Sequence, residues 1–159
     1  EISDIVAVMQ QWNCPRVCLT GGEPLLQEEM PELIEVLLAE GYSVEVETNG
    51  SQDISWLTKK EISVSMDIKC PSSEMQADMI MDNIGLLRPQ DQLKFIIDTK
   101  DDYDYALSII NIYKPRCEVV MQPVWGSDVA LANWIIRDEI DVRLSMQLHK
   151  ILWRDRKGL

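Results

Sequence analysis

Apolar and polar residues alternate along the chain with two different periods. Apolar positions recur at helical spacing in residues 3–12, 31–40, 102–113 and 128–136, and two further segments, 53–60 and 74–87, are also expected to be helical. Short apolar runs, typical of buried parallel strands, lie at 16–20, 43–48, 62–69, 92–98, 117–124 and 142–147. Six strands alternating with helices predict an α/β fold with a parallel sheet and helices outside it.

The length narrows this architecture. A closed eight-fold barrel needs about 200 residues or more, whereas the chain has 159. We therefore expect one incomplete domain over residues 1–159, a partial, open parallel β/α barrel that lacks an N-terminal strand. The chain begins with Glu1 rather than methionine, so we also expect it to start inside a longer gene product or to have been trimmed.

Composition excludes some partners. The net charge is −12, which opposes binding to nucleic acid or to an anionic membrane, because both favour a basic surface. No apolar run approaches the roughly 20 residues that span a bilayer, and no signal peptide is present. The four cysteines, at irregular spacing, are interpreted as reduced thiols of a cytoplasmic protein: Cys14, Cys18, Cys70 and Cys117.

Polar clusters follow several of the predicted strands. Parallel sheets bind ligands at the carboxyl ends of their strands, and the clusters fall there, at 20–24, 47–50, 67–69, 122–123 and 145–150. The acidic run 98–104 lies instead at the start of a predicted helix, where we expect a solvated surface without function.

The run Thr20-Gly21-Gly22-Glu23-Pro24 is the strongest chemical signal. Two glycines after a strand let a ligand approach bare backbone groups that a Cβ atom would block. Glu23 offers a carboxylate to an ammonium, as the amino-acid end of S-adenosylmethionine (SAM) would require. The alternative is a tight strand-to-helix turn in which Glu23 is only a capping residue.

This run resembles the glycine-rich GGE motif of radical SAM enzymes. In that superfamily a CxxxCxxC loop holds a [4Fe–4S] cluster. Cys14 and Cys18 have the CxxxC spacing, but Gly21 stands where the third cysteine would be. We therefore interpret Cys14 and Cys18 as loop and core residues and expect the cluster ligands upstream of residue 1, with no metal ligand in this chain.

Four further segments resemble the 7-carboxy-7-deazaguanine synthase family within that superfamily. They are Glu47-Thr48-Asn49-Gly50, Asp67-Ile68-Lys69, Gln122-Pro123-Val124 and the C-terminal Gln147-Leu148-His149-Lys150-Ile151-Leu152-Trp153. The resemblance covers essentially the whole chain. Two departures concern the fine geometry of the ligand contacts: Asp67-Ile68 replaces a common Ser-Pro, and Met146 stands where proline is usual.

The resemblance implies a reaction, cofactors and partners. SAM, a [4Fe–4S] cluster and Mg²⁺ would convert 6-carboxy-5,6,7,8-tetrahydropterin to 7-carboxy-7-deazaguanine and ammonia, for queuosine or archaeosine synthesis. An external electron donor and a homodimer are implied by the family, and this chain alone would be inactive. No catalytic side chain is assigned. SAM contacts are expected from Gly21, Gly22, Glu23, Glu47, Asn49, Asp67, Ile68 and Lys69. Substrate contacts are expected from Thr20, Gln122, Gln147, His149 and Lys150.

Less specific interpretations remain for several of these residues. Lys69 can be a surface lysine whose stem lies on the protein, Glu47 a solvated residue at the sheet end, and His149 a helix-end residue that touches no ligand. For the whole chain, two alternatives are an activating enzyme for glycyl-radical proteins, which the Gln147–Lys150 segment argues against, and a cluster-free remnant without activity. The gene sequence upstream of Glu1 would separate the last possibility from truncation.

Overall fold

The computed structural model describes residues 1–73 and 79–154. Its centre is a sheet of six parallel strands in the order β1-β2-β3-β4-β5-β6. The strands are β1 (Arg16–Leu19), β2 (Ser43–Thr48), β3 (Ser63–Ile68), β4 (Gln92–Ile97), β5 (Glu118–Pro123) and β6 (Arg143–Leu144). Each strand lies beside the strand that precedes it along the chain, and β1 and β6 form the two edges. The predicted open, parallel α/β sheet is therefore confirmed.

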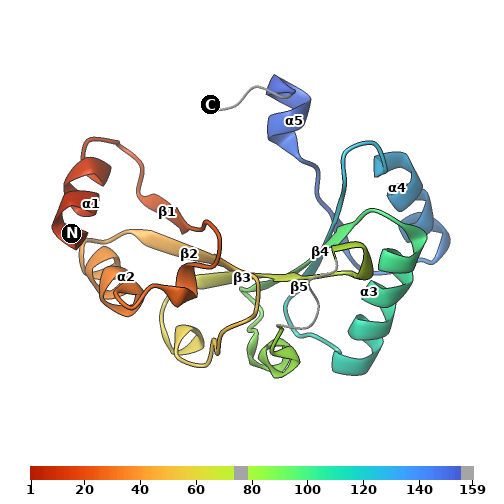
Figure 1. Ribbon diagram of the computed structural model, residues 1–159, viewed down its shortest axis with the longest axis horizontal. Coiled ribbons are helices and arrows are strands. Elements are labelled where there is room, and N and C mark those ends of the chain that lie inside the picture. The colour runs from red at the N-terminus through yellow and green to blue at the C-terminus, as the bar shows by residue number, and fades with distance from the viewer. Residues whose placement is uncertain (74–78, 155–159) are drawn as a thin grey trace.

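Helices connect the strands and cover one side of the sheet. The α-helices are α1 (Ile2–Met9), α2 (Met30–Ala39), α3 (Lys100–Tyr113), α4 (Asp128–Arg137) and α5 (Leu148–Trp153). The short 3₁₀ helices are η1 (Pro24–Leu26), η2 (Leu57–Lys59), η3 (Pro71–Ser73) and η5 (Met81–Leu86). Figure 1 shows a curved sheet with α1 to α4 around its outer side, whereas α5 stands apart on the inner side.

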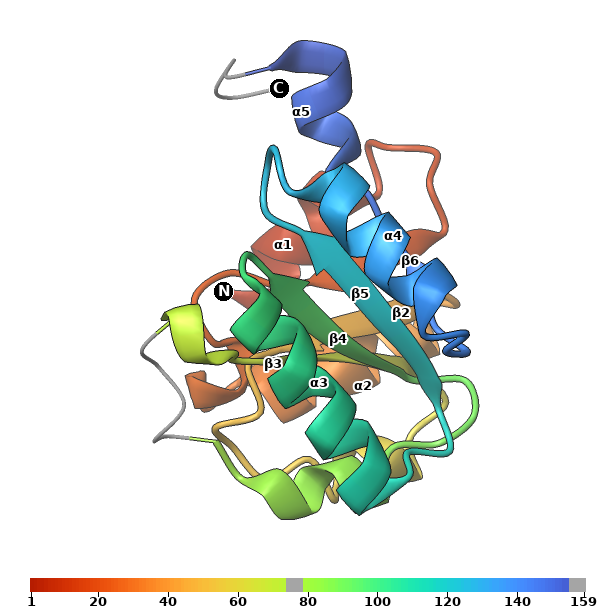
Figure 2. The same cartoon turned by 90° about the vertical axis from the view of Figure 1, so that its right-hand side faces the viewer.

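The hydrophobic core lies between the sheet and the outer helices. Alternate residues of each strand face the helices, and β2 and β4 both show the repeating pattern of one buried and one half-buried residue. The main core residues from strands and helices are Val44, Val46, Val64, Met66, Leu93, Phe95, Met121, Ile34, Leu37, Tyr103 and Leu131. In Figure 2, α3 and α4 lie in front of β4 and β5, and α5 lies beyond the C-terminal ends of these strands.

Two glycines fix turns at opposite ends of β2. Gly41 ends α2 with a φ of +85°, as the sequence predicted from its position after the last helical residue. Gly50 follows the strand with a φ of +74°, and a Cβ atom there would lie 3.1 Å from the Met66 sulfur. Most side chains disfavour this conformation, and the nearby Met66 sulfur leaves little room for a Cβ atom. Glycine therefore allows the Asn49-Gly50 turn to lie close to the end of β3.

Three predicted elements are shorter than expected. The predicted helix 53–60 is only the 3₁₀ helix η2, because Asp53 forms a local turn by accepting hydrogen bonds from the backbone and hydroxyl of Ser55. Residues 74–78 of the predicted helix 74–87 lie outside the described residues, and the described part contains η5 rather than an α-helix. The last strand covers only Arg143–Leu144 of the predicted 142–147.

The interpretation of residues 98–104 as a solvated helix start is wrong for two of them. Asp102 and Tyr103 are completely buried. The Asp102 carboxylate accepts hydrogen bonds from the backbone N–H groups of Asp98, Thr99 and Ser72. The Tyr103 hydroxyl donates to Asp138 and the Trp134 carbonyl. This acidic segment therefore fixes the start of α3 to the loop that follows β3.

Candidate active site

The expected ligand-binding segments lie at the C-terminal ends of neighbouring strands. Residues 20–23 follow β1, 48–50 end β2, 67–69 end β3, and 122–123 end β5. Because the strands are parallel and adjacent, these segments share one edge of the sheet. The structure therefore brings together most of the residues that the sequence assigned to SAM binding.

The glycine pair after β1 leaves space above its backbone. Gly21 and Gly22 have φ values of +106° and +52°. A Cβ atom built on either residue would meet no heavy atom within 4 Å. Neither glycine is therefore required by close packing within the chain. Their exposed backbone groups leave room for a ligand, and contact with SAM stays a prediction.

Glu23 is buried and makes several hydrogen bonds within the protein. Its carboxylate accepts from the Leu25 N–H at 3.0 Å, the Asn49 N–H at 2.6 Å and the Thr48 hydroxyl at 2.9 Å. It therefore caps η1 and ties the glycine turn to the end of β2, which corresponds to the alternative interpretation of Glu23 as a capping residue. A carboxylate has about four acceptor positions, so these three donors leave little capacity. Its contact with an ammonium stays a prediction.

A polar network crosses the inner face of the sheet. The Thr20 hydroxyl donates to Glu47 at 3.2 Å. The ammonium of Lys94 lies 3.8 Å from the Glu47 carboxylate and 2.9 Å from that of Asp67. Thr20, Glu47 and Asp67 were predicted as ligand-binding residues, and here they share one ion-paired cluster. Lys94 on β4 joins them.

The sequence analysis missed Lys94, although the pattern of its strand contains a signal. In Gln92-Leu93-Lys94-Phe95-Ile96-Ile97 the residues Leu93, Phe95 and Ile97 are buried in the core. Strand alternation therefore places Lys94 on the opposite, inner face. A lysine in the middle of an otherwise apolar parallel strand needs an anionic partner, and Asp67 is its neighbour in register on β3.

Burial and charge shift the pKa values of this ion pair. Burial raises the pKa of the Asp67 carboxyl, and the positive charges of Lys94 and Lys69 offset only part of that effect. Burial alone would lower the pKa of the Lys94 ammonium, but the attraction of Asp67, then of Glu47 and Glu45, outweighs it. The pKa of Lys94 therefore lies above its ordinary value, and the lysine is charged at neutral pH.

The other predicted SAM contacts differ in what they expose. Asn49 uses its amide oxygen to accept the Ser51 N–H, and its own N–H binds Glu23. The side chain of Ile68 is buried in the core, so only its backbone can reach a ligand. The Lys69 N–H lies 3.2 Å from the Met79 sulfur. A role in SAM binding stays a prediction for each of these residues.

The predicted substrate residues are divided between the sheet and α5. Gln122 lies near the end of β5, half-buried. Gln147 precedes α5, and its buried side-chain oxygen has no hydrogen-bond partner among the described residues. His149 is exposed on α5, whereas Lys150 lines a small pocket of about 370 Å³ with Trp125, Ile151 and Arg154. Within residues 1–73 and 79–154, no hydrogen bond or ion pair joins His149 or Lys150 to the network at the strand ends.

One of the two cysteines with the CxxxC spacing lies in a different environment from that expected. Cys14 is exposed in a loop, but Cys18 is exposed on the edge strand β1, so its assignment to the core is wrong. Burial of its sulfur and the charges of Glu47 and Glu45 raise the pKa of Cys18, which disfavours the thiolate that binds metals. In the part of the chain that the structure describes, no three His, Cys, Asp or Glu residues are arranged to hold a metal ion.

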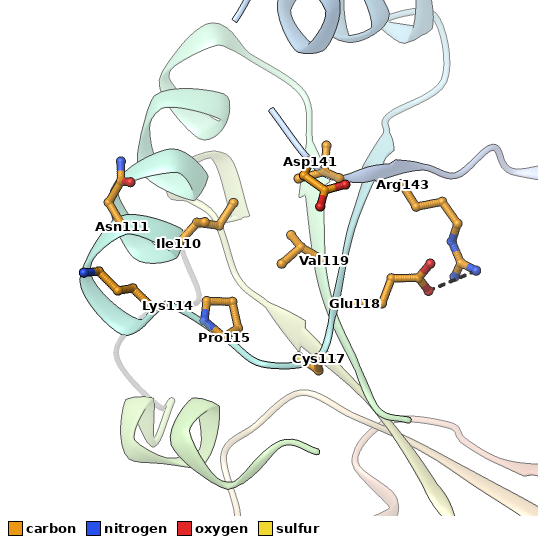
Figure 3. A pocket seen from close by; sticks show the side chains of 10 residues that line it. Ile110, Asn111, Lys114, Pro115, Cys117, Glu118, Val119, Asp141 and Arg143 are labelled. Carbon is orange, nitrogen blue, oxygen red and sulfur yellow. Dashed lines mark ion pairs between the residues drawn. The ribbon is translucent and has the colours of Figure 1, made fainter. Parts of the chain in front are cut away.

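A larger pocket lies away from the strand-end network. It has a volume of about 570 Å³ and lies between the end of α3, the start of β5 and the segment before β6. Figure 3 shows Lys114 after α3, Asp141 before β6, and the ion pair of Arg143 with Glu118 among the residues that line it. This pocket is at the N-terminal ends of the strands, opposite the edge where parallel sheets bind ligands. None of the residues predicted to bind ligands lines it.

The importance of the open space at Gly22 can be tested by Gly22→Ala. The added methyl group would enter the space that the ligand's amino-acid end is expected to occupy, so we expect the affinity for SAM to fall at least about ten-fold. The positive φ should also cost about 1 kcal/mol of stability. Isothermal titration calorimetry and urea unfolding measure the two effects.

Gly41→Ala is a matched control for this prediction. Gly41 also has a positive φ and open space around a built Cβ. It precedes β2, however, so it lies at the N-terminal ends of the strands, opposite the end where Gly22 lies. It should lose similar stability and bind SAM normally. Equal affinities for SAM in both variants would show that Gly22 serves only the turn.

No helix among the described residues combines the length and apolar character needed to cross a membrane.

No family model matches the chain. Similar proteins were found by sequence comparison. A 7-carboxy-7-deazaguanine synthase of Thermoplasma acidophilum is 34% identical over 99% of this chain and 77% of that protein. One of Methanospirillum hungatei is 36% identical over 96% of this chain and 64% of its own length. One of Clostridium acetobutylicum is 33% identical over 97% and 73%.

Comparison with solved structures agrees at the level of the fold. The crystal structure of QueE from Escherichia coli matches with a TM-score of 0.68 and 23% sequence identity. The match covers 92% of this chain and 63% of QueE. The open parallel α/β sheet thus corresponds to part of a larger known fold. Because the sequence relatives match nearly the whole chain at more than 30% identity, the chain belongs to the 7-carboxy-7-deazaguanine synthase family.

Proposed function

We propose that this chain forms the SAM- and substrate-binding part of a 7-carboxy-7-deazaguanine synthase. The reaction is the ring contraction of 6-carboxy-5,6,7,8-tetrahydropterin to 7-carboxy-7-deazaguanine with release of ammonia, which makes the enzyme a carbon–nitrogen lyase. The observation that carries the proposal is the shared edge of the sheet, where the glycine turn after β1 and Glu47 on β2 lie at the same end of the sheet as the carboxyl ends of β3 and β5. Relatives that bear this name, at 34% and 36% identity, support the same assignment.

Three cofactors belong to this proposal: SAM, a [4Fe–4S] cluster and Mg²⁺. Together, SAM and a reduced cluster would supply the radical chemistry that side chains lack. The open backbone at Gly21 and Gly22 fits the amino-acid end of SAM. Among the described residues, no three His, Cys, Asp or Glu side chains are arranged to hold a metal ion, so no ligand is assigned to the cluster or to Mg²⁺. We propose that the cluster ligands lie outside these residues.

The charges on the inner face suit SAM. Its sulfonium and ammonium outweigh its carboxylate, so SAM is a net cation. Glu45, Glu47 and Asp67 lie close enough to Lys94 to influence its pKa, and Lys69 is close enough to influence that of Asp67, so three carboxylates face two ammonium groups. The face is therefore expected to attract SAM electrostatically. Glu47, with 41% of its side chain exposed, is the carboxylate best placed to accept hydrogen bonds from ribose hydroxyl groups.

The proposed pterin site extends from β5 to α5. The substrate combines a carboxylate, which needs donors, with a guanidine-like edge, which needs acceptors. Gln122 can provide both, and Thr20 can hydrogen-bond the ring. The unpartnered buried oxygen of Gln147 is an acceptor that a substrate N–H could satisfy. His149 and Lys150 are proposed to donate to the carboxylate.

His149→Ala tests the α5 end of this site. A hydrogen bond to a charged group contributes roughly 1.5–3 kcal/mol, so we expect the dissociation constant of the pterin to rise about ten- to a hundred-fold. Because His149 is distant in the chain from the glycine turn, SAM affinity should stay nearly unchanged. Equilibrium binding of each ligand measures both values. Normal pterin binding would show that this exposed histidine is a surface residue.

Turnover tests the function as a whole. The protein expressed from its complete gene is reconstituted with iron and sulfide, and supplied with SAM, Mg²⁺, the tetrahydropterin and a reductant as external electron donor. We expect 7-carboxy-7-deazaguanine and ammonia, detected by mass spectrometry. Intact substrate after full cluster loading would contradict the proposal. A cytoplasmic location and a homodimer are also proposed, from the similarity to the synthase family. Sedimentation of the purified protein tests whether it is a dimer.

A further inference from the structure

Lys94 connects four parts of the inner face. It lies on β4, and its ammonium contacts Asp67 on β3 at 2.9 Å and Glu47 on β2 at 3.8 Å. Through the other oxygen of Glu47 the network continues to Thr20, after β1. Only 14% of the Lys94 side chain is exposed. One largely buried cation therefore contacts two carboxylates on neighbouring strands.

Glu47 is restrained by this network but not enclosed by it. One carboxylate oxygen faces Lys94 and the other accepts from Thr20, while 41% of the side chain remains exposed. An exposed glutamate without partners would sample several rotamers and lose that freedom on binding a ligand. A carboxylate that is already held in place loses less, so its hydrogen bonds contribute more to affinity.

Asp67 explains why a cation is needed at this position. Its side chain is 25% exposed, and burial makes ionisation unfavourable, with Glu47 as a further negative neighbour. Lys69 on the same strand end also acts on Asp67, but the direct contact comes from Lys94. The ammonium of Lys94, 2.9 Å away, compensates the negative charge of Asp67.

We propose that Lys94 is a positioning residue for SAM: its ammonium holds the carboxylates of Glu47 and Asp67 in the orientation in which they meet the ligand. The inference rests on the proposed function, from which it takes the identity of the ligand. A positioning role and a purely electrostatic role predict opposite changes in SAM affinity when the charge of Lys94 is removed. If Lys94 acted only through its charge, removing it would make the face more negative and would strengthen the binding of cationic SAM.

Three variants of the protein expressed from its complete gene test this inference. Lys94→Met keeps the length of the side chain and removes the ammonium, and Lys94→Arg keeps the charge. Lys60→Met is the matched control, because Lys60 forms an exposed ion pair with Glu35 away from the strand ends. We expect SAM affinity, measured by calorimetry, to fall about ten-fold in Lys94→Met, to recover within about two-fold in Lys94→Arg, and to be unchanged in Lys60→Met.

A fourth, double variant covers the case in which Lys94→Met does not fold. The double variant Lys94→Met with Asp67→Asn removes the uncompensated, largely buried carboxylate, and its SAM affinity should still be about ten-fold weaker, because Glu47 has lost its cationic partner. If the unmodified protein does not bind SAM, the proposed function fails and this inference fails with it. If that protein binds SAM and the folded Lys94 variants bind it equally well or more tightly, only the inference is wrong.

Discussion

Replacing Asp91 by alanine is expected to destabilise the protein by about 3–5 kcal/mol, because it leaves a partly buried guanidinium without its counter-ion. The Asp91 side chain is completely buried, and it accepts hydrogen bonds from the Arg88 guanidinium at 2.9 Å and from the Val64 N–H at 2.9 Å. The result would be a large fraction of the total stability of a domain of this size. Urea unfolding measures it.

The size of this effect follows from what Arg88 holds together. Its guanidinium also donates to the backbone carbonyls of Thr58, Lys60 and Ile62, at 2.7–3.0 Å. Arg88 and Asp91 thereby fix the segment before β3 to the segment before β4. Without the carboxylate, both the charge and the Val64 N–H lose their partner. Asp91→Asn, which keeps the shape and part of the hydrogen bonding, should lose less than Asp91→Ala.

Asp104→Ala is a matched control for Asp91→Ala. Asp104 forms an ion pair with Lys100 one helical turn away, and 58% of its side chain is exposed. Exposed pairs of this kind contribute about 0.3–0.5 kcal/mol. A loss for Asp91→Ala as small as that of Asp104→Ala would show that the Arg88–Asp91 pair does not stabilise the sheet.

Asp102→Asn should lower the free energy of unfolding at neutral pH by roughly 2–3 kcal/mol, because the buried carboxylate accepts three backbone N–H groups. An asparagine amide has a single acceptor oxygen and would place its NH₂ group against one of these donors. The loss should loosen the start of α3 and the loop that follows β3. Urea unfolding at a series of pH values measures it.

The stabilisation by Asp102 depends on pH in a direction that follows from its pKa. Burial of Asp102 would raise its pKa, but the hydrogen bonds from Ser72, Thr99 and Asp98 outweigh burial and lower it below the ordinary value of 3.8. The stabilisation is therefore complete above pH 3.8 and is lost as the pH falls through the pKa of the folded state. The wild-type protein and Asp102→Asn should differ most at neutral pH and converge in acid. A difference that stays constant down to acid pH would contradict the assignment.

The sequence predicted the strands accurately where local pattern determines them. The strand 43–48 matches β2 because Val44 and Val46 alternate with glutamates and the Asn49-Gly50 turn ends the run. The predictions of α-helices at 53–60 and 74–87 were less accurate, because tertiary contacts determine these segments. The segment 53–60 has too few residues to be a stable helix without tertiary support, and Asn83 in η5 donates to the carbonyls of Gly50 and Gln52 rather than facing solvent.

The candidate site was predictable in outline but not in its internal partners. Glycines after a strand and polar residues at strand ends are visible in the sequence, and Thr20, Glu47 and Asp67 do meet. The Lys94 partner of Asp67 and the partners of Glu23 at the end of β2 lie 25 or more residues away, so no local pattern shows them. The same holds for Asp102, whose burial depends on a loop 30 residues earlier in the chain. Such contacts depend on strand register, which the sequence pattern alone does not give.

We propose that SAM binds at the C-terminal strand ends on the inner face of the sheet. Hydrogen–deuterium exchange of the protein expressed from its complete gene, with and without SAM, tests it most directly. We expect SAM to protect the backbone amides in residues 20–23 and 47–50, and none of those around the pocket of Lys114 and Arg143 (Figure 3). Protection at that pocket, with unchanged exchange at the strand ends, would contradict it.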